Sequence, residues 1–290
     1  MALHPRRPAA ALAIALLLGG APRARGDGPA AAGAVRTSLT ADLYGRVAPR
    51  GLFLAAGLQR RWMAEDGDSP LLRGRYAQLG IWAGSSPSLA QGTVAAEWVP
   101  VAPLQLRMQY DAIAYYGAFG SLLTFPSAAS SFGAAALRER AGTERTGVAH
   151  RLQAAPTLRA RVGRLVLRNQ AELSWYALPA RGAWSYEVEY DTLLASRDLV
   201  LFDRLAALFE AWRGAGEATL LAGPAYEITH AGKAGLTRQR LEGVLFWSPA
   251  DRWGALARPR LSALVGLNLR DRNRQGEPFA ALGAGADLDL

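Results

Sequence analysis

The chemistry open to this chain is limited by its three histidines and by the absence of cysteine. A hydrolase or acyltransferase needs a nucleophile beside a base, and that base is most often histidine. His4 lies in an export signal. His150 precedes Arg151 rather than a serine, and His230 lies in a predicted loop. Because no metal-ligand cluster or glycine-rich phosphate loop is recognisable either, we expect no enzyme, no metal and no cofactor.

Arginine and glutamate offer a second kind of chemistry, the attraction of ions. The chain has a formal charge of +9, and Lys233 is its only lysine. Loss of residues 1–26 would remove four arginines and no acid, which leaves +5. A charge of this size, carried by arginines that alternate with acids, does not indicate a nucleic-acid partner. The positions of the arginines along the chain are therefore more informative than the net charge.

Eight charged side chains are candidates for an ion-attracting passage. Arginines in a confined space of low dielectric raise the local concentration of anions, so we expect a passive pore or channel for small anionic solutes. The competing interpretation is a plugged, structural or surface-binding barrel in which glutamates neutralise the arginines. The candidates are Arg107, Arg151, Arg159, Arg161, Arg168, Glu172, Glu187 and Glu189.

The elements that must position these side chains are β-strands. In residues 104–111 every second side chain is apolar and every intervening one is polar, which is the two-residue period of a strand with one apolar face. Residues 165–176 and 150–162 repeat the pattern, with Arg168, Glu172 and Arg151 on the polar face. Segments of about ten residues or more are long enough to cross a bilayer at a tilt.

The alternation recurs along almost the whole chain. Thirteen segments qualify, whereas single-chain bacterial barrels normally have an even number of strands, so we expect 12 strands, with 14 as the alternative. Residues Leu264, Val244 and Phe246 fall on the nominally polar side, which a packed lumen would tolerate. The segments are 35–46, 52–64, 72–84, 90–99, 104–117, 149–162, 164–177, 184–192, 199–212, 217–230, 237–248, 258–271 and 279–290.

An export signal precedes the strands. Residues 1–26 contain Arg6 and Arg7, an apolar run from Ala9 to Leu18 and a small-x-small site at 24–26, the features of a secretory signal peptide. Gly19-Gly20-Ala21 is an alternative cleavage site. Residues 27–34 form a short lead, and 35–290 the barrel. No later segment has the roughly 18 uninterrupted apolar residues of a transmembrane helix.

The connections divide into short and long ones. Residues 99–103 and 162–164 are predicted to be periplasmic turns, and 270–278 an outer loop. The connection at 118–146 is too long to be a simple turn, and loops of this length usually have a role. It could fold into the mouth as a constriction or remain outside as a mobile loop.

Together, the alternating strands and the final segment Phe279 to Leu290 resemble the outer-membrane β-barrel class of Gram-negative bacteria, although the class usually ends in an aromatic residue rather than Leu290. The resemblance implies an all-β, antiparallel up-and-down barrel in the bacterial outer membrane, in contact with its lipid and inserted by the barrel-assembly machinery. Two alternatives remain, namely a barrel-embedded lipid-modifying enzyme and a soluble secreted β-sandwich. Against the sandwich are the strand length and the placement near strand ends of Trp62, Trp98, Trp175, Trp184 and Trp247.

Overall fold

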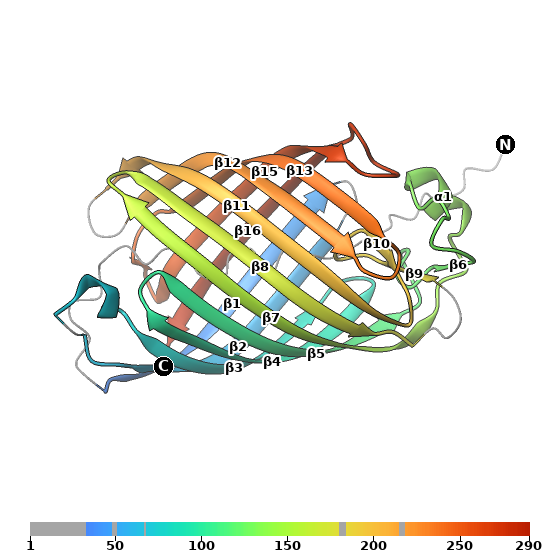
Figure 1. Ribbon diagram of the computed structural model, residues 1–290. Helices are drawn as coiled ribbons and strands as arrows, with labels where there is room; N and C mark the ends of the chain where they lie inside the picture. Colours follow the sequence, from blue (N-terminus) through green and yellow to red (C-terminus); the bar gives the residue numbers. More distant parts are fainter. Residues whose placement is uncertain (1–32, 48–50, 67, 180–183, 215–217) are drawn as a thin grey trace.

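The computed structural model describes residues 33–47, 51–66, 68–179, 184–214 and 218–290, and within them twelve long antiparallel strands form one closed barrel. The strands are steeply tilted (Figure 1), and pairing of the first with the last, from Ser38 opposite Asp289 to Val47 opposite Ala280, closes the barrel. The strands are β1 (Val35–Val47), β2 (Gly51–Met63), β3 (Tyr76–Ser85), β4 (Leu89–Val101), β5 (Leu104–Tyr116), β7 (Thr146–Val162), β8 (Leu165–Ala177), β11 (Arg197–Arg213), β12 (Thr219–Ala231), β13 (Leu236–Ser248), β15 (Leu256–Arg270) and β16 (Pro278–Asp289).

The alternation in the sequence separates an outer wall from a lumen. On β7, Leu152 is 49% exposed whereas Arg151 is 1% exposed, and on β8 Leu173 is exposed while Glu172 is buried. An outer wall of exposed leucines is what a barrel in lipid requires. The predicted facing of these strands is therefore confirmed. Leu264 and Phe246 are buried, which places these two exceptions to the pattern inside a packed lumen.

The strand count of 12 is confirmed, and the surplus segment is 184–192. It does not cross the barrel but forms a short hairpin of β9 (Trp184–Glu187) and β10 (Thr192–Leu194). Its alternation misled the prediction because both faces are used inside the lumen: Tyr186 and Val188 join the hydrophobic core, while Glu187 is buried among polar groups. Trp184 accordingly packs against the core and is not part of an outer aromatic belt.

The connections gather at two ends of the barrel. The loop end carries residues 86–88, 117–145, 178–179, 184–196, 232–235 and 271–277, and the terminal end carries 64–66, 68–75, 102–103, 163–164 and 249–255 together with Leu290. Figure 1 shows α1 (Ala134–Glu139), β6 (Thr124–Phe125), β9 and β10 together at the loop end, opposite the C-terminus. The short turns and the long loops predicted from the sequence thus lie at opposite ends, in one consistent alternation.

Residues 117–145 fold together with residues 184–196 of a second long connection at the loop end. They form a three-stranded sheet of β6, β9 and β10, in which Phe125 pairs with Trp184. Leu123, Phe125 and Leu193 from these loops are at most 1% exposed and share one hydrophobic core with wall residues. Burial of large apolar side chains contributes roughly 1.5 to 3 kcal/mol each. The inserted loops are therefore a packed part of the barrel.

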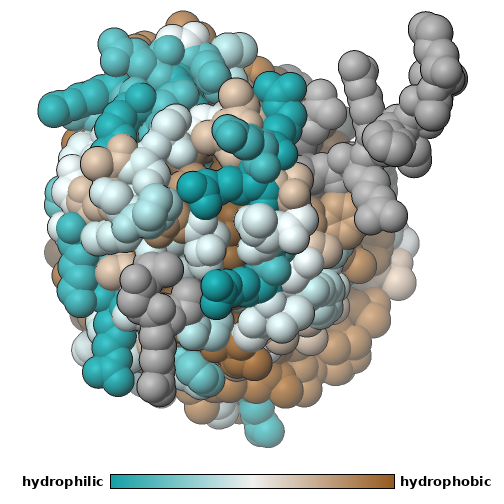
Figure 2. Space-filling view, turned by 90° about the vertical axis from the view of Figure 1, so that its right-hand side faces the viewer, coloured by the Kyte–Doolittle hydropathy of each residue, from teal (hydrophilic) through white to brown (hydrophobic). Residues whose placement is uncertain are grey.

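At this end the surface is largely hydrophilic, with hydrophobic residues along the adjoining wall (Figure 2).

A polar pair that includes a carboxylate lies among the leucines of the outer wall. Asn169 on β8 donates a hydrogen bond to Asp203 on β11, with Nδ2 to Oδ2 at 3.0 Å. The neighbours of Asp203 on the same face of β11 are Leu201 and Leu205, which are 48% and 52% exposed. A carboxylate therefore lies on the same face as the apolar residues of the wall.

Among the described residues, no helix is long and apolar enough to span a membrane.

Candidate functional site

The most elaborate polar site in the lumen is the turn of the β9–β10 hairpin, residues Glu187 to Asp191, called here the acidic turn. The Glu187 carboxylate accepts the backbone N–H of Glu189 at 2.9 Å and that of Tyr190 at 2.7 Å, which stabilises the reversal of the chain. Asp191 has a positive φ of 50°, a conformation that Asp tolerates better than most residues. Three carboxylates are thereby concentrated in five residues.

Two arginines of the wall bind this turn from β1 and β7. Arg46 donates to the carbonyl oxygens of Val188 and Glu189, the latter at 3.1 Å. Arg151 donates from Nη1 to the Glu189 carboxylate and, at 2.7 Å, from Nε to Asp111 on β5. Charge-assisted hydrogen bonds of this kind are roughly twice as strong as neutral ones. The wall therefore holds both the backbone and the carboxylate of the turn.

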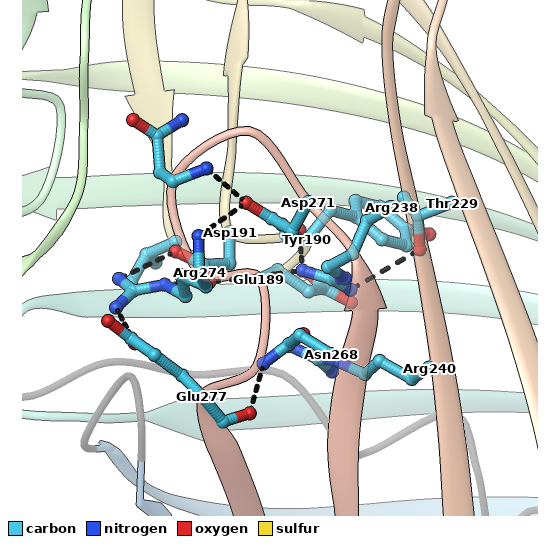
Figure 3. Close-up of polar contacts among 12 residues, drawn as sticks. Glu189, Tyr190, Asp191, Thr229, Arg238, Arg240, Asn268, Asp271, Arg274 and Glu277 are labelled. Carbon is cyan, nitrogen blue, oxygen red and sulfur yellow. Dashed lines mark hydrogen bonds and ion pairs between the residues drawn. The ribbon is translucent and has the colours of Figure 1, made fainter.

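Two further arginines bind Tyr190 and Asp191. Arg274, in the 271–277 connection, forms a bidentate pair with Asp191, with Nε to Oδ2 at 2.5 Å and Nη2 to Oδ1 at 3.0 Å. Arg238 on β13 donates to the Tyr190 carbonyl and lies 4.0 Å from the Asp191 carboxylate. Figure 3 shows the turn between Arg274 and Arg238. Four arginines from four parts of the barrel thus converge on five consecutive residues.

The acidic turn contains carboxylates in opposite electrostatic situations. Burial alone would raise the pKa of Asp191, but Arg274 outweighs it and lowers that pKa to about 2. Burial and then the neighbouring Glu189 raise the pKa of Glu187 to about 7. Asp191 is therefore a permanent anion that locks the turn, whereas Glu187 changes its charge near neutral pH.

A second ionic layer continues the site into the wall of β11, β12 and β13. Glu227 accepts a hydrogen bond from Arg204 at 2.6 Å and from Arg238 at 3.0 Å, while Glu242 lies 2.8 Å from Arg204. Arg238 belongs to both layers. All of these side chains are at most 8% exposed. Such a network favours one arrangement of the loop against the wall, because separating any charge from its partner in a buried site is costly.

The predicted site residues divide between two regions. The acidic turn and its partners include Arg151, Glu187 and Glu189, and Glu172 joins them because the Tyr190 hydroxyl donates to its carboxylate at 3.1 Å. The other four candidates lie elsewhere in the terminal half of the lumen. Arg161 pairs with Glu210 beside the terminal end, and the remaining three are Arg107, Arg159 and Arg168.

Sequence reasoning missed Arg46, Asp111, Asp191, Arg238 and Arg274. Arg46, Asp111 and Arg238 have the polar-face parity of their strands, which is the one signal that could have included them. Arg274 and Asp191 are separated by 83 residues, and both lie in connections, so no pattern in the sequence joins them. His150 lies on the outer, apolar face of β7, where its Nδ1 is 2.7 Å from the Tyr110 hydroxyl. His230 was wrongly assigned to a loop, since it lies in β12.

Solved structures of other proteins are similar to this chain at low sequence identity. No family model and no curated protein matches the chain. Among solved structures, the NanC porin is 9% identical with a TM-score of 0.42, over 87% of this chain and 100% of that one. The β domain of the Bordetella autotransporter BrkA is 11% identical with a TM-score of 0.41, covering 88% and 99% of the two chains. An outer membrane channel from Pseudomonas putida F1 is 11% identical, with a TM-score of 0.38 and coverage of 93% and 100%.

The closed barrel with its exposed apolar wall has the outer-membrane β-barrel fold. Within the part of the chain that the structure describes, no three His, Cys, Asp or Glu side chains are grouped to hold a metal ion.

Proposed function

We propose that this chain is a plugged barrel of the bacterial outer membrane, closed to solutes in the described conformation by its two inserted loops. The observation that carries the proposal is the acidic turn, which is bound to β1, β7, β13 and the 271–277 connection at once. A loop tied to distant parts of the wall crosses the passage that a solute would need. The hydrophobic core that the inserted loops share with the wall supports the same proposal, because Leu123 and Leu193 in it are fully buried.

Planar-bilayer conductance of the purified, refolded protein tests this function. We expect the wild type to be silent, and we expect channels when residues 185–194 are replaced by a short Gly-Ser linker. Heat-modifiable gel mobility verifies that the shortened barrel is folded. A matched control shortens residues 127–131 of the other long loop, outside the acidic turn, and should remain silent. Open channels in the wild type would contradict the proposal, as would a folded, linker-containing barrel that never conducts.

A second candidate is a solute channel whose inserted loop moves aside. It is favoured by the terminal half of the lumen, where Arg107, Arg159 and Arg168 are partly exposed. These three, rather than Arg151, are the arginines able to attract an anion, because Asp111 and Glu189 match the charge of Arg151. Wild-type channels that open only at intermittent intervals would favour this candidate over a permanent plug.

The proposal includes partners and orientation. Outer-membrane lipid surrounds the exposed leucines, the barrel-assembly machinery inserts the chain, and the terminal end faces the periplasm, since periplasmic turns are typically short in this class. We assign the chain no catalytic role and no nucleic-acid partner. Both described histidines are outside the acidic turn: His150 contacts Tyr110, and His230 contacts Thr237 with Nδ1 to Oγ1 at 2.9 Å.

A further inference from the structure

The terminal half of the lumen contains two arginines in direct cross-strand register. Arg159 on β7 and Arg168 on β8 are paired residues of the antiparallel ladder, and both face the lumen. Like charges directly opposite each other destabilise a sheet. Further cations surround them, since Arg61 is an electrostatic neighbour of Arg159, and Arg204 of Arg168. This arrangement is unfavourable unless another anion offsets it.

Arg159 and Arg168 each donate a hydrogen bond to a neutral glutamine side chain. Arg159 donates to the Gln105 side-chain oxygen, and Arg168 donates to that of Gln170 at 2.6 Å. The Nε of Arg159 is buried and has no hydrogen-bond partner among the described residues. In contrast, Arg151 and Arg274 at the loop end each bind carboxylates directly. Arg159 therefore differs from the structural arginines of the same barrel.

The nearby carboxylates offset only part of the positive charge of these arginines. Glu97 is an acidic neighbour of both Arg159 and Arg168, but it lies 3.8 Å from Arg107 and accepts the Tyr76 hydroxyl. Glu172, the other acidic neighbour of Arg168, accepts hydrogen bonds from Gln170, Gln153 and Tyr190. Glu97 and Glu172 thus lie beside four arginines, namely Arg61, Arg107, Arg159 and Arg168, so the local balance of charge is positive.

We propose that Arg159 and Arg168 together bind a small oxyanion, a sulfate, phosphate or carboxylate group, in the terminal half of the lumen. A guanidinium group can donate two parallel hydrogen bonds to two oxygens of one such anion. Both side chains are partly exposed, in contrast to the 1% exposure of Arg151, so solvent reaches this part of the lumen. The amides of Gln105 and Gln170 orient the arginines without cancelling their charge. The site does not depend on whether the barrel conducts.

Binding is measured on the full barrel refolded in detergent, with sodium sulfate as the probe at ionic strength matched with sodium chloride. Sulfate stabilises folded proteins in general, so the informative quantity is the difference between variants. We expect sulfate to raise the melting temperature of the wild type by about 2 to 4 °C more than that of R159Q or R168Q. In chloride at low ionic strength, R159Q should melt at or above the wild-type temperature, because the substitution removes a repulsion. An arginine with a purely structural role would give the opposite result.

The matched control is R161Q, two residues further along β7, where the arginine pairs with Glu210. Its response to sulfate should equal that of the wild type. Isothermal titration of the wild type with sulfate measures binding directly and does not require any variant to fold. Titration with glutarate distinguishes a preference for carboxylates from one for tetrahedral anions, and binding of either supports the site. Equal sulfate shifts in all four proteins, or no heat of binding with both anions, would overturn the proposal.

Discussion

Arg151 on β7 donates a hydrogen bond to the carboxylate of Glu189, a residue 38 positions later in the chain that belongs to an inserted loop rather than to the wall. The same guanidinium binds Asp111 on the neighbouring strand. One buried side chain therefore joins two strands of the barrel to the loop that fills it. The stability of the wall and the position of the loop should depend on each other.

The first prediction concerns this junction. Arg151→Gln leaves the carboxylates of Asp111 and Glu189 buried without their cation, so we expect a loss of about 3 to 5 kcal/mol in the free energy of unfolding. Urea unfolding in detergent, followed by tryptophan fluorescence, measures it. Arg252→Gln is the control, because its pair with Asp289 is more than one-third exposed on both sides and should contribute less than about 1 kcal/mol. Similar losses for both variants would argue against a special role for Arg151.

The second prediction concerns pH. The pKa of Glu187 is raised by burial from the ordinary 4.5 to about 7, so between these values the folded barrel binds more protons than the unfolded chain. Stability should therefore fall as pH rises from about 4.5 to 7, with the full cost present above pH 7. Charged neighbours that act on the same region are Glu189, Arg151 and Arg46.

Glu187→Gln removes the carboxyl group that titrates. The melting temperature of the variant should therefore change less between pH 4 and 8 than that of the wild type. At pH 8 the variant should be more stable than the wild type, since its neutral amide avoids the repulsion from Glu189. Melting temperatures by circular dichroism across the pH range provide the measurement. An unchanged slope would show that Glu187 titrates normally.

The third prediction tests the two faces of the wall. Leu173→Asp and Leu106→Asp place a charge in lipid, where the worst cases cost roughly 2 to 4 kcal/mol and acids somewhat less. Gln105→Asp and Gln170→Asp place it in the lumen, beside Arg159 and Arg168 respectively. The lipid-facing variants should give lower yields of heat-modifiable barrel. Equal yields from the two sets would mean that lumen and lipid are equally tolerant of an acid.

The fourth prediction concerns the pair of Asn169 and Asp203 on the outer wall. Asp203→Asn removes a charge among the exposed leucines of β11 while keeping an acceptor for Asn169, so the folded barrel in lipid should become more stable. Asn169→Leu removes the donor that compensates the carboxylate and should have the opposite effect. Unfolding in lipid vesicles measures both variants. A less stable Asp203→Asn barrel would indicate that the carboxylate binds something in the membrane.

Two-residue alternation by itself determined the barrel. A closed sheet between lipid and lumen imposes one chemical environment on each face of every strand, so residues such as Leu152 and Arg151 record their facing locally. The short turns and long loops followed from the gaps between strands, and 12 was the preferred even count. These features depend on contacts between neighbouring strands, which nearby residues encode.

What fills the lumen was decided only by the tertiary structure. The hairpin at 184–192 alternates like a wall strand, and only its position reveals that both of its faces are buried. Likewise, the sequence contains no signal that Arg274 pairs with Asp191, because they meet through loops that converge from separate strand pairs. Facing is a property of one strand, whereas an ion pair across a lumen depends on closure of the whole barrel. That is why Arg151 and Arg159, eight residues apart on one face of β7, have different surroundings: one is matched by carboxylates, and the other lies beside a second arginine.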